Sequence, residues 1–190
     1  FILCIASILA TAQAVTVGNL RCEHLINPQG IDVVKPRLSW ILQSNERGQL
    51  QTAYQLIAAS TPENLENGKA DLWNSGKINS DQSLNVLYAG KVLNATQKIC
   101  WKVKIWDKNG VESSFSPIAH FSAGLLNTTD WRASWIGADK PLSTDKPNGE
   151  LPEINARYLR KEFELGKKIK SATLYVCGLG PVSYTHLRAH

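Results

Sequence analysis

One run of this chain alternates apolar and polar residues with a period of two, and that period constrains the fold more than any other feature. Its apolar members are Ile99, Trp101, Val103 and Ile105. Lys102 and Lys104 stand between the last three of them. Because successive side chains of a strand point to opposite faces of its sheet, the run predicts a strand with one buried and one solvated face.

Shorter runs of the same period occupy residues 15–124 and are divided by turn residues. They place three sets on single faces: Leu38, Trp40 and Leu42; Leu84, Val86 and Tyr88; Ala119, Phe121 and Ala123. An Asn109-Gly110 pair lies between the last two strands, and Asn-Gly tolerates the positive φ values of a tight hairpin. Helix is expected only as one turn after Thr61 and Pro62, where threonine can cap and proline can start a helix. We therefore predict an all-β fold, with a fibronectin-III or immunoglobulin-like antiparallel β-sandwich over residues 15–124.

The rest of the chain is too short for a second complete domain. Its 190 residues, 43% of them apolar, suffice for one domain of about 100 residues and something shorter. Residues 125–155 are rich in turn formers and are predicted to be a linker. Strand patterns return at residues 158–165 and 172–177. Two strands cannot close a core, so residues 156–180 are expected to be the first strands of an incomplete second β-sandwich.

Residues 1–14 are interpreted as a signal peptide that lacks its basic start. The run up to Ala10 is apolar, and the small residues Ala12 and Ala14 provide the A-x-A pattern that signal peptidase accepts. A buried strand and a membrane anchor are the alternatives, but about ten apolar residues are fewer than the ~20 that span a bilayer. We therefore expect cleavage after Ala14, a secreted or periplasmic protein, and no stable membrane span.

The cysteines and charges exclude several classes of protein. Cys4 would leave with the signal peptide, so Cys22, Cys100 and Cys177 remain, and no C-x-x-C pair indicates zinc or thioredoxin-like chemistry. A Cys22–Cys100 disulfide would suit an exported protein, while buried free thiols are the simpler interpretation. The net charge of +5 is spread along the chain among apolar residues, so no nucleic-acid partner is expected.

The six tryptophans raise the question of sugar binding, because an aromatic face packs well against the C–H face of a pyranose. Trp40 and Trp101 alternate in register with leucine, valine and isoleucine, so both are expected in the core. Trp106 lies on the face opposite Trp101, and Trp73 lies close to Gly76. Trp73 and Trp106 are therefore the candidate exposed sugar platform.

A series of short strings carries a family resemblance. They are Asn19-Leu20-Arg21-Cys22-Glu23, Pro36-Arg37-Leu38-Ser39-Trp40, Gln51-Thr52-Ala53-Tyr54-Gln55, Leu72-Trp73-Asn74-Ser75-Gly76-Lys77, Cys100-Trp101-Lys102-Val103-Lys104-Ile105-Trp106-Asp107, Trp131-Arg132-Ala133-Ser134-Trp135-Ile136-Gly137 and Arg157-Tyr158-Leu159-Arg160-Lys161-Glu162-Phe163. In this order they resemble the N-terminal fibronectin-III-like domain of bacterial α-L-rhamnosidases and its junction with the next β-sandwich domain. Ile99 departs from the family, in which a tyrosine usually starts this strand and makes a corner hydrogen bond.

The resemblance implies an inverting glycoside hydrolase, in which two carboxyl groups lie about 6.5–9.5 Å apart across the scissile bond. It places those carboxylates in a downstream (α/α)₆ barrel that this chain does not reach. Within the chain, Glu162 and Glu164 fit a solvated strand face, and Asp107 and Glu112 fit a turn. No catalytic residue, cofactor or metal site is therefore predicted.

The last residues are set apart from this pattern. Residues 181–190 resemble translated sequencing-adapter read-through and are interpreted as a foreign tail. His186 and His190, which lie within it, have metal-ligand spacing on a helix, but the origin of the tail argues against a site.

These observations lead to one expected function and two alternatives. We expect the non-catalytic N-terminal fragment of a secreted α-L-rhamnosidase whose complete form hydrolyses terminal α-L-rhamnose of glycans or glycosides. Its partners would be the remaining domains of that enzyme and, through them, rhamnose-containing glycans. The alternatives are a stand-alone carbohydrate-binding module and an adhesion-type fibronectin-III protein.

Overall fold

The computed structural model describes residues 15–137, 159–162, 164, 166, 168–169 and 172–178. The chain separates into two units, Phe1–Ala133 and Ser134–His190. The predicted signal peptide, residues 1–14, and the predicted foreign tail, residues 181–190, lie outside the described residues.

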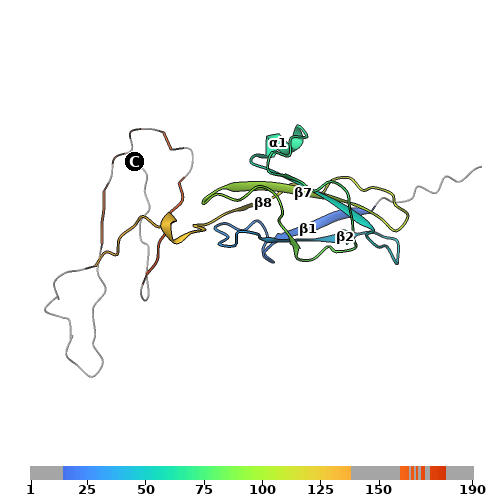
Figure 1. The fold of residues 1–190 in the computed structure, drawn as a ribbon, viewed down its shortest axis with the longest axis horizontal. Helices are drawn as coiled ribbons and strands as arrows, with labels where there is room; N and C mark the ends of the chain where they lie inside the picture. Colours follow the sequence, from blue (N-terminus) through green and yellow to red (C-terminus); the bar gives the residue numbers. More distant parts are fainter. Residues whose placement is uncertain are drawn as a thin grey trace, which may run out of the picture. The chain divides into compact units, whose positions relative to one another are not determined.

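The first unit is a sandwich of two antiparallel sheets, as the sequence predicts (Figure 1). One sheet has the order β1-β2-β6, built from β1 (Thr16–Cys22), β2 (Arg37–Gln43) and β6 (Val86–Leu87). The other has the order β4-β3-β7-β8, built from β4 (Trp73–Asn74), β3 (Ala53–Ala59), β7 (Lys98–Trp106) and β8 (Ala119–Ser122), with β5 (Ile78–Asn79) also paired to β3. Figure 1 shows β1 and β2 in one layer and β7 and β8 in the other, with the short helix α1 on the outer side of the second layer.

The long pairing of β3 with β7 sets the two faces of the larger sheet. Its register runs from Ala53↔Trp106 to Ala59↔Cys100. Directly paired residues of antiparallel strands have side chains on the same face. The inner face therefore carries Tyr54, Leu56, Ala58, Trp101, Val103 and Ile105, all of them buried in the main core. The alternation predicted for this strand is confirmed.

The opposing layer fills the other half of that core. Leu38 and Trp40 of β2 are buried and Leu42 packs at the margin, as expected. Val86 is buried as well, but the expectation that Leu84 shares its face is wrong, because Leu84 is 63% exposed. Asn85 has a φ of 55°, so the backbone turns between these two residues and β6 begins only at Val86.

The chain turns back after β7 at the predicted residues, with a different geometry. Asp107 Oδ1 accepts hydrogen bonds from the N–H groups of Asn109 (2.8 Å) and Val111 (2.9 Å). Within the turn, Gly110 has a positive φ of 75° and Asn109 does not, so the turn does not use both residues of the Asn-Gly pair in the left-handed region. β8 begins only at Ala119, after the irregular segment of residues 112–118.

Two serine side chains take the place of a strand beside the second half of β7. Ser116 Oγ accepts from the N–H of Val103 (3.1 Å) and Ser113 Oγ from that of Ile105 (3.0 Å). The N–H groups of the same two serines donate back to the carbonyls of Val103 and Ile105, each at 2.8 Å. Backbone groups that β8 does not reach are thereby satisfied, as buried peptide groups require.

The predicted helical turn is present as α1 (Pro62–Glu66). Thr61 caps it by accepting from the N–H of Asn64 at 3.3 Å, and Pro62 occupies its first turn. Leu65 is buried against Ile57, Ala59 and Cys100, which form a second small core on the outer face of the larger sheet. That face is therefore only partly solvated.

Little regular structure follows β8 in the described residues. A single 3₁₀ turn, η1 (Thr128–Asp130), lies in the predicted linker. No strand is assigned among the described residues from 159 to 178, where Leu159, Leu174 and Val176 are exposed. The incomplete second sandwich stays a prediction.

Candidate functional site

Trp73, one half of the predicted sugar platform, lies at the edge of the core. It pairs with Ala58 on the inner face of the sheet. Its ring meets that of Tyr88 edge to face, with centroids 5.2 Å apart and planes at 71°. A Cβ added at Gly90 would lie 2.6 Å from the Cβ of Trp73. The side chain is therefore fixed by packing on its core side.

Trp106, the other half, lies on the outer face of the same sheet, where it pairs with Ala53. Its ring is half-buried and lies beneath two ammonium groups, Lys77 Nζ at 4.4 Å and Lys104 Nζ at 5.1 Å from the centroid. Because Trp73 and Trp106 face opposite sides of the sheet, the structure does not bring them together in one platform.

The outer face instead carries an alternating row of lysines and aromatic rings, which we call the lysine-aromatic ladder. Its members are Lys77, Trp106, Lys104, Phe115 and Lys102. Lys104 Nζ lies 5.3 Å from the Phe115 centroid and Lys102 Nζ lies 4.9 Å from it. Each distance is within the range of a cation–π interaction. The ladder thus holds three ammonium groups over two rings.

The sequence indicates only part of this ladder. Lys102, Lys104 and Trp106 recur at every second residue, which shows that they share a face. Lys77 comes from the loop between β4 and β5, and Phe115 from the irregular segment before β8. No spacing rule links these loop residues to the strand, so only the tertiary structure assembles the set.

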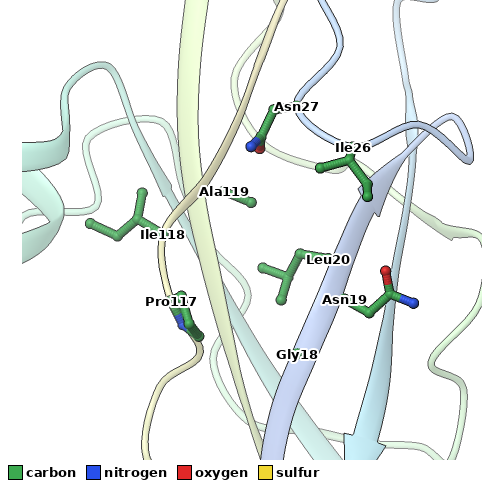
Figure 2. Close-up of a pocket in the computed structure, with 8 residues that line it drawn as sticks. All are labelled: Gly18, Asn19, Leu20, Ile26, Asn27, Pro117, Ile118 and Ala119. Carbon is green, nitrogen blue, oxygen red and sulfur yellow. The ribbon is translucent and has the colours of Figure 1, made fainter.

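A shallow apolar cleft lies between β1 and the segment that enters β8 (Figure 2). Its volume is about 230 Å³, and its lining residues are Gly18, Asn19, Leu20, Ile26, Asn27, Pro117, Ile118 and Ala119. Figure 2 shows Leu20 pointing from β1 toward the β8 side of the cleft. The pairing of β1 with β2 shifts register between Gly18 and Arg21, within the stretch of β1 that contributes Gly18, Asn19 and Leu20 to the cleft. The cleft is lined by no ionisable side chain and therefore lacks the groups for acid–base chemistry.

The carboxylates of the sandwich that have partners serve the fold. Glu23 is paired with Arg37, Asp71 accepts from the backbone and hydroxyl of Ser60, and Asp107 holds the turn described above. Glu112 pairs with Lys104 at 3.1 Å. In the second unit, Glu162 pairs with Arg160, and Glu164 is exposed. The hydrogen bond from the Arg37 guanidinium holds the pKa of Glu23 below its ordinary value.

The two thiols of the sandwich are buried and free. Cys22 lies in the main core and Cys100 in the small outer core, so the larger sheet separates them. Burial, together with the neighbouring Glu23 carboxylate, raises the pKa of Cys22 to about 12. A thiol is a poor nucleophile unless it ionises, so neither the disulfide nor thiol catalysis fits this arrangement.

The part of the chain that the structure describes contains no group of three or more histidine, cysteine, aspartate or glutamate side chains arranged to hold a metal ion. Its helices are all too short or too polar to cross a membrane.

Comparison with known proteins gives a consistent result. Residues 17–127 match the family model described as Rha78A-like, N-terminal immunoglobulin domain. The chain is 40% identical over 177 residues to an alpha-L-rhamnosidase of Formosa agariphila, a match that covers 92% of this chain and 18% of that relative. The chain thus spans less than a fifth of the curated relative.

Solved structures agree with this match. One is the Streptomyces avermitilis alpha-L-rhamnosidase complexed with L-rhamnose, with a TM-score of 0.63 and 38% identity, covering 66% of this chain and 12% of that one. Another is the alpha-L-rhamnosidase from Dictyoglumus thermophilum, with a TM-score of 0.64 and 37% identity, covering 66% of this chain and 14% of that one.

Proposed function

Because this chain belongs to the family of the Rha78A-like, N-terminal immunoglobulin domain, we propose that it is the non-catalytic N-terminal part of an α-L-rhamnosidase. The complete enzyme would hydrolyse terminal α-L-rhamnose of glycans or glycosides. The observation that carries this proposal is the match to alpha-L-rhamnosidases over less than a fifth of their length. The sandwich would act as a scaffold for the remaining domains.

The chemistry of the described residues supports the non-catalytic role. Glycoside hydrolysis needs a general acid and a second carboxylate positioned across the glycosidic bond. The partnered carboxylates of the sandwich are engaged in ion pairs and hydrogen bonds, and none lines the cleft in Figure 2. A sugar held against this domain would therefore meet no acid and base pair in that cleft.

The test compares two proteins at equal concentration. The fragment of residues 15–180 should release no aryl group from an aryl α-L-rhamnoside, whereas the complete gene product should. Turnover by the fragment would contradict the non-catalytic role. Inactivity of the complete product on every rhamnoside tried would contradict the proposed activity.

The proposal includes export from the cytoplasm, directed by residues 1–14 as a signal peptide that is cleaved off after Ala14. Val15 is only 4% exposed and β1 starts at Thr16, so a cut after Ala14 would leave the packed strand intact. Mass spectrometry of the secreted protein should find Val15 at its N-terminus. A mature protein that retains the preceding residues would contradict the cleavage, without affecting the proposed enzymatic role.

A further inference from the structure

The lysine-aromatic ladder is an ordered set of charged groups on the outer face of the larger sheet. Lysine side chains on a protein surface normally sample many rotamers, and holding them in place costs entropy. Here each of the three ammonium groups lies within 5.3 Å of an aromatic centroid. The rings therefore restrict the lysines in advance, which lowers the entropic cost of binding a ligand to them.

The charges of the ladder are only partly compensated within the described residues. Lys104 pairs with Glu112 at 3.1 Å. Lys102 donates to the carbonyl of Leu65 at 3.2 Å, and α1 brings Glu63 and Glu66 to that end of the row. Lys77 is exposed and has no ion pair among the described residues. The Lys77 end of the ladder, around Trp106, is therefore the end with uncompensated positive charge.

The Glu112 carboxylate shows which kind of ligand group fits the Lys77 end of the ladder, around Trp106. Its side chain is 58% exposed, while that of Lys104 is 18% exposed. A carboxylate thus reaches Lys104 from the solvent side without displacing the ladder. A ligand carboxylate or sulfate that approaches from the same side would lie close to Lys104 and Lys77, whose ammonium groups lie over one ring. Both lysines could donate charge-assisted hydrogen bonds to this anion, and such bonds are stronger than those between neutral groups.

We propose that the Lys77–Trp106–Lys104 end of the ladder binds an acidic polysaccharide through its uronate or sulfate groups. Charge complementarity selects an anion, because the two ammonium groups over the Trp106 ring attract an acidic sugar more strongly than a neutral one. Stacking of a nucleobase needs an aromatic face that is not covered by ammonium groups, so the Trp106 ring is poorly suited to nucleic acid. The choice of a glycan among polymeric anions rests on the proposed function, and the site itself goes beyond it.

The experiment titrates the whole chain with oligogalacturonate as the acidic probe, followed by tryptophan fluorescence and calorimetry. Maltooligosaccharide of equal length is the neutral control. We expect binding of the acidic oligomer alone, weakened by added salt. Failure to bind the acidic oligomer, or equal binding of the neutral one, would overturn the proposal.

Two matched double variants distinguish binding at this site from an effect of the net charge of the chain. Lys77→Gln with Lys104→Gln should weaken binding by about tenfold or more, because two charge-assisted contacts are lost. Lys35→Gln with Lys91→Gln removes the same charge from exposed lysines elsewhere and should change affinity by less than about twofold, because lysines outside the site make no contact with the ligand. Equal losses in both pairs would mean that only the overall charge matters and would overturn the site.

A gain of affinity gives a test that a folding defect cannot imitate. Glu112→Gln removes the carboxylate that competes for Lys104 and should tighten binding several-fold. Glu46→Gln removes the partner of Lys108, outside the ladder, and should tighten it less. No difference between them would contradict the role of Lys104.

Two more outcomes keep this proposal distinct from the proposed function. Single-stranded DNA of equal charge bound as tightly as the oligogalacturonate would overturn the choice of a glycan. Binding is measured without hydrolysis, so a chain that binds the acidic oligomer supports this site even if the complete enzyme fails on rhamnosides. Rhamnosidase activity without such binding would overturn this site alone.

Discussion

Trp40 donates its indole N–H to Oε1 of Gln51 across 2.9 Å, and both side chains are buried. Gln51 in turn donates through Nε2 to the carbonyls of Ser80 (3.0 Å) and Gln82 (2.9 Å). One amide thus joins β2 of the first sheet to the entry of β3 in the second and to the loop that leads to β6. A tryptophan expected to fill space also organises the connection between the layers.

Removing either core tryptophan should greatly destabilise the sandwich. Trp40 and Trp101 are each 1% exposed, and truncation of such a side chain to alanine typically costs about 3–5 kcal/mol. Urea unfolding of Trp40→Ala and Trp101→Ala should show this loss. Trp131→Ala is the control, because Trp131 is 45% exposed and should cost far less. A core variant that unfolds like the parent would refute the strand assignment.

The two tryptophans should differ when replaced by phenylalanine. Trp40→Phe removes the hydrogen bond to Gln51, whereas Trp101 Nε1 has no hydrogen-bond partner in the described structure. An unsatisfied buried acceptor adds about 1–3 kcal/mol, so Trp40→Phe should be the more destabilising by roughly 1 kcal/mol or more. The free energies of unfolding decide the order, and the reverse order would contradict the assigned role of Gln51.

Ser113 and Ser116 beside β7 should contribute to the stability of the sandwich although both are polar. Ser113→Ala and Ser116→Ala each remove a hydroxyl that accepts from a strand N–H. Each should cost about 1–3 kcal/mol, because a buried donor is left without its partner. Ser114→Ala, at an exposed neighbouring position, should change stability by less than about 0.5 kcal/mol. Hydrogen exchange should also accelerate at Val103 in Ser116→Ala and at Ile105 in Ser113→Ala.

The Glu23–Arg37 pair should make stability depend on acid pH. Arg37 Nε donates to Glu23 Oε2 at 3.0 Å, and this hydrogen bond lowers the pKa of Glu23 from 4.5. Since the folded pKa lies below the unfolded one, the contribution is present above about pH 4.5 and is lost as pH falls through the folded pKa. Glu23→Gln should cost up to about 1 kcal/mol at neutral pH and should flatten the decline of stability below that value. Arg37→Gln should flatten it likewise, and an unchanged profile in both variants would contradict the linkage.

Gly90 should tolerate no side chain. A Cβ there would lie 2.5 Å from Tyr88 Oη, 2.6 Å from Trp73 Cβ and 2.7 Å from the carbonyl oxygen of Leu72. Gly90→Ala should therefore destabilise the sandwich by about 1–3 kcal/mol through overpacking. Gly137→Ala, where nothing lies within 4 Å of the added atom, is the control. Equal thermal unfolding of both variants would contradict the close approach at Gly90.

The sequence by itself determined which faces of β2, β7 and β8 are buried, because a period of two maps directly onto the two faces of a sheet. The burial of Trp40 and Trp101 was predictable in this way, and the cap at Thr61 was predictable from the threonine and proline that start the helix. Leu84 was not, because the left-handed backbone at Asn85 breaks the period between two residues that otherwise fit it.

Only the tertiary structure decided which groups meet across the sheets. The lysine-aromatic ladder needs Lys77 and Phe115 from separate loops, and the second half of β7 needs Ser113 and Ser116 where a strand partner was expected. Periodicity records the direction of a side chain within one strand. Contacts between segments distant in sequence depend on how the chain closes its loops, and no local spacing encodes that closure.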